Sequence, residues 1–247
     1  MLALASGCEL AFPIESYGGD DAGGDGGTGT PPKVFSSPGP AAALYGGYPK
    51  SFTITLAADQ PGTMIYYTLD GSTPDTSSSS STTPVKGITI SATSTVKYFG
   101  VHNGAASAVA TEMFSIDAAT ATSNAGYLIT SVTLDGTSPV VIASAGSTLS
   151  AKANVQSWVQ TSCSACAGQV VFGVDTTDQG CLSDGGLGVY PGTTVNGKAF
   201  TVKVPNTPGV HEVRVAHIEQ TSCAAAMADM ALANRPTRAR IGVIIVP

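Results

Sequence analysis

The chain has 247 residues and a formal net charge of −6, and only 11% of its residues are charged. This length predicts two small domains with a linker, and the abundance of Ser, Thr and Val suits short strands. An acidic chain without a basic stripe cannot neutralise phosphates, which argues against a nucleic-acid partner. No run of about 18 apolar residues occurs, so the sequence predicts no membrane-spanning helix.

The first residues end in Ser6, Gly7 and Cys8. Small residues directly before a cysteine resemble the lipobox of bacterial lipoproteins, in which the cysteine thiol is lipidated and becomes the mature N-terminus. Ala5 stands where that family prefers leucine, and a signal peptide would have a basic region and a longer apolar region before it. We therefore expect a truncated signal, with the natural start upstream of Met1 and lipidation at Cys8. The alternative is a free cysteine in a disordered tail.

The segment 18–32 consists mainly of glycine and aspartate and has no apolar side chain large enough to nucleate a core. Its aspartates repel one another, so the composition predicts a flexible, extended spacer. Residues 1–32 are therefore interpreted as a truncated lipoprotein signal and an acidic linker. They imply a protein of the bacterial cell envelope, at the outer membrane or cell surface, held to the membrane through the lipid anchor only.

Residues 33–117 show the two-residue period of strands with one buried face. Phe52, Ile54 and Leu56 alternate with serine and threonine, which predicts a strand. Turns rich in Gly and Pro separate it from the strands that follow. Repeated short strands of this kind predict a β-sandwich. The further strands are expected over 64–69, 87–91, 95–101 and 111–116.

Residues 63–74 read Thr-Met-Ile-Tyr-Tyr-Thr-Leu-Asp-Gly-Ser-Thr-Pro. This run resembles the signature of the chitobiase/β-hexosaminidase C-terminal domain family, and the runs 35–39 and 106–110 also fall where that family places them. The resemblance implies an immunoglobulin-like accessory module of secreted glycosidases and bacterial surface proteins, without catalytic residues. The five serines at 77–81 are interpreted as a solvated loop insertion.

Residues 125–247 show a similar pattern of strands and corners and predict a second sandwich. The fold class is therefore all-β, with two immunoglobulin-like β-sandwich modules in tandem after a disordered Gly/Asp-rich linker. An alanine-rich run over 224–233 predicts one short helix before the last strand. The strands of this module are expected over 128–134, 148–159, 170–174, 200–204, 213–215 and 241–246.

The second module contains Cys163, Cys166, Cys181 and Cys223. A structural zinc site usually has two CxxC pairs, but only one is present, and a redox pair would need a helix that the pattern does not supply. Two structural disulfides suit an exported chain with an even count of cysteines beyond Cys8. We favour Cys163 and Cys166 each bonding a different partner among Cys181 and Cys223, because a bond between Cys163 and Cys166 closes a tight loop.

The sequence offers no motif for catalysis, since it contains no GxSxG, P-loop or HExxH pattern. His211 and His217 lie about 20 Å apart along one predicted strand, too far to share a metal. A Gly-rich stretch around Cys181 is interpreted as a solvated loop. We therefore expect no catalytic residues, no cofactor and no metal. The acids of that stretch are Asp175, Asp178 and Asp184.

Trp158 is the ligand-binding candidate. Strict alternation places it on the polar face of its strand with Lys152, Asn154 and Gln156, where an exposed ring would stack on a sugar or anchor a partner. The alternative, which we favour, is a β-bulge near the strand end that turns the ring inward.

The leading hypothesis is a cell-surface lipoprotein whose non-catalytic sandwich modules bind glycan or cell wall. The alternative is a structural or protein-binding envelope component with no carbohydrate affinity, whose partner would be a cell-surface protein.

Overall fold

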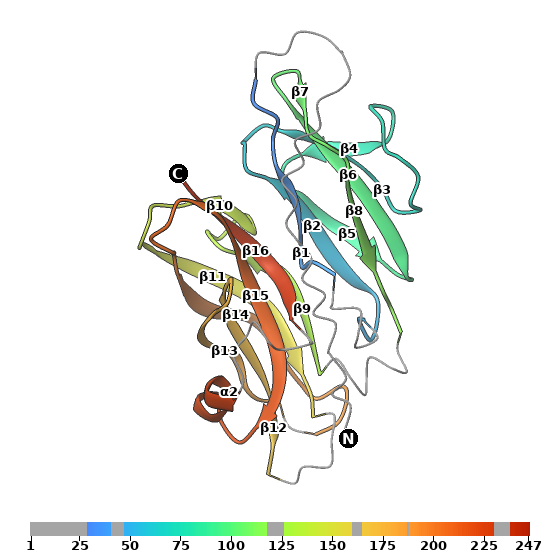
Figure 1. Ribbon diagram of the computed structural model, residues 1–247. Helices are drawn as coiled ribbons and strands as arrows, with labels where there is room; N and C mark the ends of the chain where they lie inside the picture. Colours follow the sequence, from blue (N-terminus) through green and yellow to red (C-terminus); the bar gives the residue numbers. More distant parts are fainter. Residues whose placement is uncertain (1–28, 41–46, 118–125, 160–164, 187, 230–237) are drawn as a thin grey trace, which may run out of the picture.

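The computed structural model describes residues 29–40, 47–117, 126–159, 165–186, 188–229 and 238–247 (Figure 1). Within these ranges nearly every element is a strand, which confirms the predicted all-β sandwich class. The described residues form four sheets, and these form two pairs that lie side by side in Figure 1. In the described part of the chain, no helix is long and apolar enough to cross a bilayer.

The N-terminal sheet pair encloses a core that matches the predicted alternation. Phe52, Ile54 and Leu56 of β2 are at most 4% exposed, and Ile65 and Phe114 of the facing sheet are fully buried with them. One sheet has the order β1-β2-β5, and the other has β4-β3-β6-β7 with β8 also paired to β6. The strands are β1 (Val34–Ser37), β2 (Phe52–Ala58), β3 (Met64–Thr68), β4 (Ser79–Thr82), β5 (Val85–Ile90), β6 (Ser94–His102), β7 (Ala105–Ala106) and β8 (Ala110–Phe114).

Only the first two residues of the serine run, Ser77 and Ser78, lie in a loop as predicted, and the other three belong to a strand. Ser79–Thr82 form β4, which pairs antiparallel with β3 and exposes all four of its side chains. The run has no apolar residue to signal a strand, because β4 contributes backbone hydrogen bonds but nothing to the core. Strand β4 is the edge strand of the five-stranded sheet of the N-terminal pair, and its outer edge is not covered by another strand of that sheet.

The C-terminal sheet pair encloses a second core. Its five-stranded sheet has the order β10-β16-β15-β12-β13, in which β10 and β16 are parallel, and its other sheet has the order β14-β11-β9. The predicted helix is present as α2 (Cys223–Asp229), and residues 230–233 lie outside the described ranges. The strands are β9 (Tyr127–Thr133), β10 (Val140–Ile142), β11 (Thr148–Ser157), β12 (Ala167–Val174), β13 (Thr177–Gly186), β14 (Thr193–Lys203), β15 (Gly209–Gln220) and β16 (Ala239–Val246).

The stretch around Cys181, predicted as a loop, is strand β13. Its pairing with β12 has three register shifts. The glycines and aspartates of this stretch, on which the loop prediction rested, are accommodated by these irregularities. Cys181 bonds Cys223 at a Cα–Cα separation of 5.9 Å and ties α2 to the sheet edge. The pairing favoured from the sequence is therefore wrong. These two cysteines cannot act as zinc thiolates; Cys166 is also disulfide-bonded, and Cys163 lies outside the described residues.

Removing the Cys181–Cys223 bond is expected to cost about 2–4 kcal/mol of unfolding free energy. The bond spans 42 residues of sequence, so it restricts a long loop of the unfolded chain. The double variant Cys181→Ala/Cys223→Ala should show this loss in urea denaturation, together with lower helical signal if α2 detaches. Mutating both cysteines leaves the Cys166 disulfide untouched, which chemical reduction would not. An unchanged denaturation midpoint would contradict the expectation.

The two sheet pairs pack directly on each other through β1 and β2 on one side and β9 and β16 on the other. Ala57 packs with Val140 and Val243 in a small apolar cluster. The Ser37 hydroxyl donates to the carbonyl of Ile241, and the Gly39 amide donates to the carbonyl of Arg240. Apolar contact and hydrogen bonds together hold the pairs in one arrangement.

Candidate functional site

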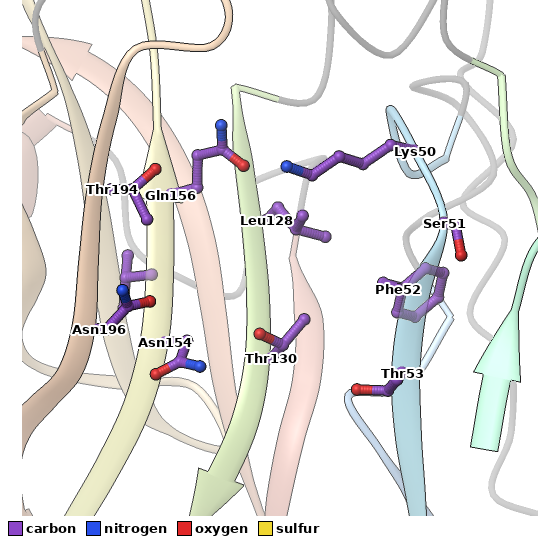
Figure 2. A pocket seen from close by; sticks show the side chains of 11 residues that line it. Lys50, Ser51, Phe52, Thr53, Leu128, Thr130, Asn154, Gln156, Thr194 and Asn196 are labelled. Atoms are coloured by element: carbon purple, nitrogen blue, oxygen red, sulfur yellow. The ribbon is translucent and has the colours of Figure 1, made fainter. Parts of the chain in front are cut away.

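A cleft of about 300 Å³ opens where the two sheet pairs meet, and we call it the junction cleft (Figure 2). Residues 50–53, at the start of β2, form one wall, and strands β9, β11 and β14 form the other. The cleft exists only because the two halves of the chain pack together. Its lining residues are Lys50, Ser51, Phe52, Thr53, Leu128, Thr130, Asn154, Val155, Gln156, Thr194 and Asn196.

Two side-chain amides of β11 are fixed by the backbone around them. The Asn154 Oδ1 accepts the amide proton of Gly197 at 2.8 Å, and the Gln156 Nε2 donates to the carbonyl of Pro191 at 2.8 Å. These partners define which atom of each amide is oxygen and which is nitrogen. Asn154 therefore keeps donor capacity at Nδ2 and Gln156 keeps acceptor capacity at Oε1. Two residues apart on one strand, the two groups are about 7 Å apart.

The rest of the cleft combines hydroxyls, one cation and a small apolar floor. Figure 2 shows Lys50 extending from the N-terminal side toward Gln156 and Leu128. Phe52 and Leu128 are 4% and 7% exposed, so most of each side chain is buried in the core and only a small part borders the cleft. Among the described residues that line the cleft there is no carboxylate. The lining therefore matches a neutral ligand rich in hydroxyl groups better than a cation.

Trp158 does not line this cleft, because its side chain is fully buried at 0% exposure. It packs in the core cluster of the N-terminal sheet pair, with its ring perpendicular to that of Tyr190 at 5.1 Å. The predicted polar face is correct, since Gln156 lines the cleft on the same face. The exposure that strict alternation would give is wrong and the burial that we favoured is confirmed, because Trp158 packs into the core of the other sheet pair. A ring in this position has no free face for a sugar.

The favoured bulge is not the reason for the burial of Trp158. The register of β11 shifts between Ala153 and Val155 against β14, four residues before the tryptophan. The residues with positive φ at the shifts are Ser131 of β9 and Gly197 of β14, so the irregularity lies in the neighbouring strands. The alternation of β11 continues through it.

The two histidines of β15 have opposite environments. His211 Nδ1 contacts Asp175 Oδ2 at 2.7 Å, and its Nε2 contacts the carbonyl of Thr207 at 2.8 Å. Burial alone would lower the pKa of His211, but the hydrogen bonds to Asp175 and Thr207 raise it. Burial lowers the pKa of His217 to about 4, against a smaller opposing effect of Glu219. His217 is therefore neutral at pH 7.

The stability contributed by neutral His217 is expected to fall in acid. Its pKa is depressed from 6.5 to about 4 in the folded state, so the contribution is complete above pH 6.5 and is lost as pH falls toward 4. The loss by pH 4.5 should be on the order of 2 kcal/mol. His211 has the opposite sign: its raised pKa contributes stability below 6.5 that is lost as pH rises through the folded value.

Urea denaturation at pH 7.5 and pH 4.5 tests this expectation. The variant His217→Gln should lose less stability between the two pH values than the parent chain, because it cannot take up the proton. Thr201→Ala, an exposed change on β14 that removes no titratable group, is the control and should keep the parent's pH dependence. An identical pH dependence in the parent and His217→Gln would contradict the assignment.

The remaining predicted sites do not gather into a centre. Cys8 lies outside the described residues, as does the linker before residue 29. Asp175 pairs with His211 at the β12–β13 turn, Asp178 is in β13, and the Asp184 side chain lies outside the description. Within the described ranges, no three His, Cys, Asp or Glu side chains are grouped as a metal site would require.

The family described as Fn3 associated matches residues 54–114, from β2 to the end of β8. This segment is therefore similar to a family of β-sandwich modules associated with fibronectin type III domains, which are typically non-catalytic. The match covers less than half of the chain, and the more specific resemblance to the chitobiase C-terminal family remains a prediction. A comparison with curated proteins found no match.

Proposed function

We propose that this chain is a non-catalytic recognition protein of the bacterial cell envelope, tethered by a lipid at Cys8, that binds a glycan in the junction cleft. The observation that carries the glycan proposal is the set of neutral amide and hydroxyl groups in the lining of the cleft, where Lys50 is the one charged residue among the described lining residues. Asn154 and Gln156 present a donor and an acceptor group in fixed positions, and Thr53, Thr130 and Thr194 add hydroxyls to the lining of the same cleft. Sugars are recognised by such convergent neutral polar groups beside a limited apolar surface.

Retention on insoluble glycans tests the proposal. The chain should be retained on at least one of chitin, cellulose and peptidoglycan, with affinity in the micromolar to millimolar range. The variant Asn154→Ala/Gln156→Ala should lose about tenfold or more in affinity, because each truncation leaves ligand hydroxyls without a partner. Thr201→Ala, an exposed change on β14 outside the cleft, is the control. Absence of retention on all three glycans would reject glycan binding.

The proposed anchor is tested separately by intact mass. Native protein extracted from the membrane fraction should carry the mass of a lipid on Cys8, and Cys8→Ser should remove that mass and release the protein. If the membrane fraction contains the chain without a lipid, the proposed anchor is rejected, and the glycan proposal is unaffected.

The second candidate is a protein-binding envelope component, and strand β4 is the observation that favours it. All four side chains of Ser79–Thr82 are exposed, and β3 covers only one edge of the strand. An uncovered edge offers backbone groups to a partner strand. This function predicts a crosslinked partner on intact cells and no retention on glycans.

A further inference from the structure

A second cleft lies between β1 of the N-terminal sheet pair and β15 of the C-terminal pair, and we call it the outer groove. Its volume of about 710 Å³ exceeds the 300 Å³ of the junction cleft and falls in the usual range for small-molecule sites. Phe35 of β1 and Val210 of β15 supply its apolar surface, and Val210 is 37% exposed. The two clefts share no lining residue.

Both carboxylates of the groove already interact with groups of the protein. Asp175 Oδ2 contacts His211, and its Oδ1 accepts the backbone amide of Glu212 at 2.9 Å. The Glu212 carboxylate forms an ion pair with Arg214 and lies 3.5 Å from Arg240 Nη1. The negative charge of the groove is therefore compensated from within the protein.

His211 adds positive charge to this balance. Its Nε2 faces the Thr207 carbonyl, which only accepts, so this nitrogen carries a proton. Its Nδ1 faces the Asp175 carboxylate, which also accepts. Both contacts are hydrogen bonds only when the ring carries two protons and is an imidazolium.

The cations lining the groove outnumber its acids. Lys33, Arg214 and Arg238 line the groove with two carboxylates, and His211 adds a fourth positive group when its ring carries both protons. This count covers only the described residues that line the groove, and it contrasts with the net charge of −6 of the whole chain. A cationic pocket with an apolar surface selects an anion over a neutral or cationic ligand of the same size.

We propose that the outer groove binds a small organic anion, a carboxylate or phosphate carried on an apolar body. The anionic group lies toward Lys33 and Arg238, and the apolar body lies against Phe35 and Val210. This site is independent of the glycan proposal, because it has different lining residues and requires a charged ligand.

Binding of octanoate and octyl phosphate to the full chain, measured by calorimetry and by amide chemical shifts, tests the proposal. At least one of them should bind, about tenfold or more tighter than octanol or octylammonium, which share the apolar body. The two anions distinguish carboxylate from phosphate as the preferred group. Added salt should weaken the binding, because part of the attraction is electrostatic.

The double variant Lys33→Gln/Arg238→Gln should weaken binding of the better anion about fivefold or more. Lys203→Gln, an exposed lysine at the end of β14, removes the same charge elsewhere and should leave the affinity unchanged. Comparable binding of octanol and the anions, undiminished binding by the double variant, or no binding of either anion at about 10 mM would each overturn the proposal.

Discussion

Replacing Arg240 with alanine is expected to lower the free energy of unfolding by about 3–5 kcal/mol. Arg240 of β16 lies between the sheet pairs, where its side chain is 16% exposed and forms an ion pair with Glu112 of β8, which is 14% exposed. It also donates to the carbonyl of Ser36 at 3.2 Å and to its hydroxyl at 2.9 Å. Burial alone would lower the pKa of Arg240, but the charges of Glu112, Tyr98 and Glu212 raise it.

The large loss of stability comes from Glu112, the carboxylate that would remain without its partner. Without the guanidinium, Glu112 would have to carry its charge in a site with little water or take up a proton, and both are unfavourable. Chemical denaturation of Arg240→Ala and of the double variant Arg240→Met/Glu112→Gln separates this effect. The double variant should recover much of the loss, because it removes both charges together.

Arg214→Ala is the matched control. Arg214 also pairs with a glutamate, Glu212, but their side chains are 31% and 27% exposed, so this pair is less buried than the pair of Arg240 and Glu112, and Arg240 Nη1 remains 3.5 Å from the other Glu212 oxygen. Its loss should stay within about 1 kcal/mol. Equal losses in Arg240→Ala and Arg214→Ala would contradict the special position of Arg240.

Arg240 is also expected to determine whether the two sheet pairs unfold together. Its hydrogen bonds join β16 to β1 and β8, so they cross between the pairs. Scanning calorimetry should give one transition for the parent chain and a broader or divided one for Arg240→Ala, since the pairs would lose their main polar connection. A single sharp transition at lower temperature would instead mean that the apolar contacts around Ala57 and the hydrogen bonds of Ser37 and Gly39 suffice for coupling.

Burial of one strand face is the part of this fold that the sequence predicts well. Phe52, Ile54 and Leu56 alternate with polar residues because one side of β2 faces the core. Strands β4 and β13 were not predicted, because neither has a regular alternation of apolar and polar residues. β4 is serine-rich and fully exposed, and β13 contains glycine and aspartate, so backbone pairing defines both without an apolar signal.

The junction cleft is less predictable, since it depends on contacts between distant parts of the chain. Lys50 and Gln156 reach one cleft only because the two sheet pairs pack together, and neither residue type signals a site by itself. The disulfide pairing was predicted wrongly for the same reason: spacing along the chain does not determine which strand lies beside which helix, and Cys181 bonds Cys223. The polar face of β11 was predicted correctly, but not that another sheet pair covers its end.

Replacing Trp158 with alanine is expected to cost about 3–5 kcal/mol of unfolding free energy. The side chain is fully buried and joins the core of the N-terminal sheet pair although it follows β11 of the other. The backbone of residue 192 lies close to Trp158. Gly192 has a φ of 60°, and a Cβ there would lie 2.6 Å from the Trp158 Cβ, so no side chain at 192 fits beside the ring.

Denaturation of Trp158→Ala and of Val189→Ala separates burial from simple proximity. Val189 lies in the neighbouring loop but is 73% exposed, so its truncation should change stability by about 0.5 kcal/mol or less. Trp158 is the only tryptophan of the chain, so its fluorescence gives an independent test. Acrylamide should quench the emission weakly in the folded protein and strongly after unfolding. Equal quenching in both states would mean that the ring is accessible, and it would restore Trp158 as a binding residue.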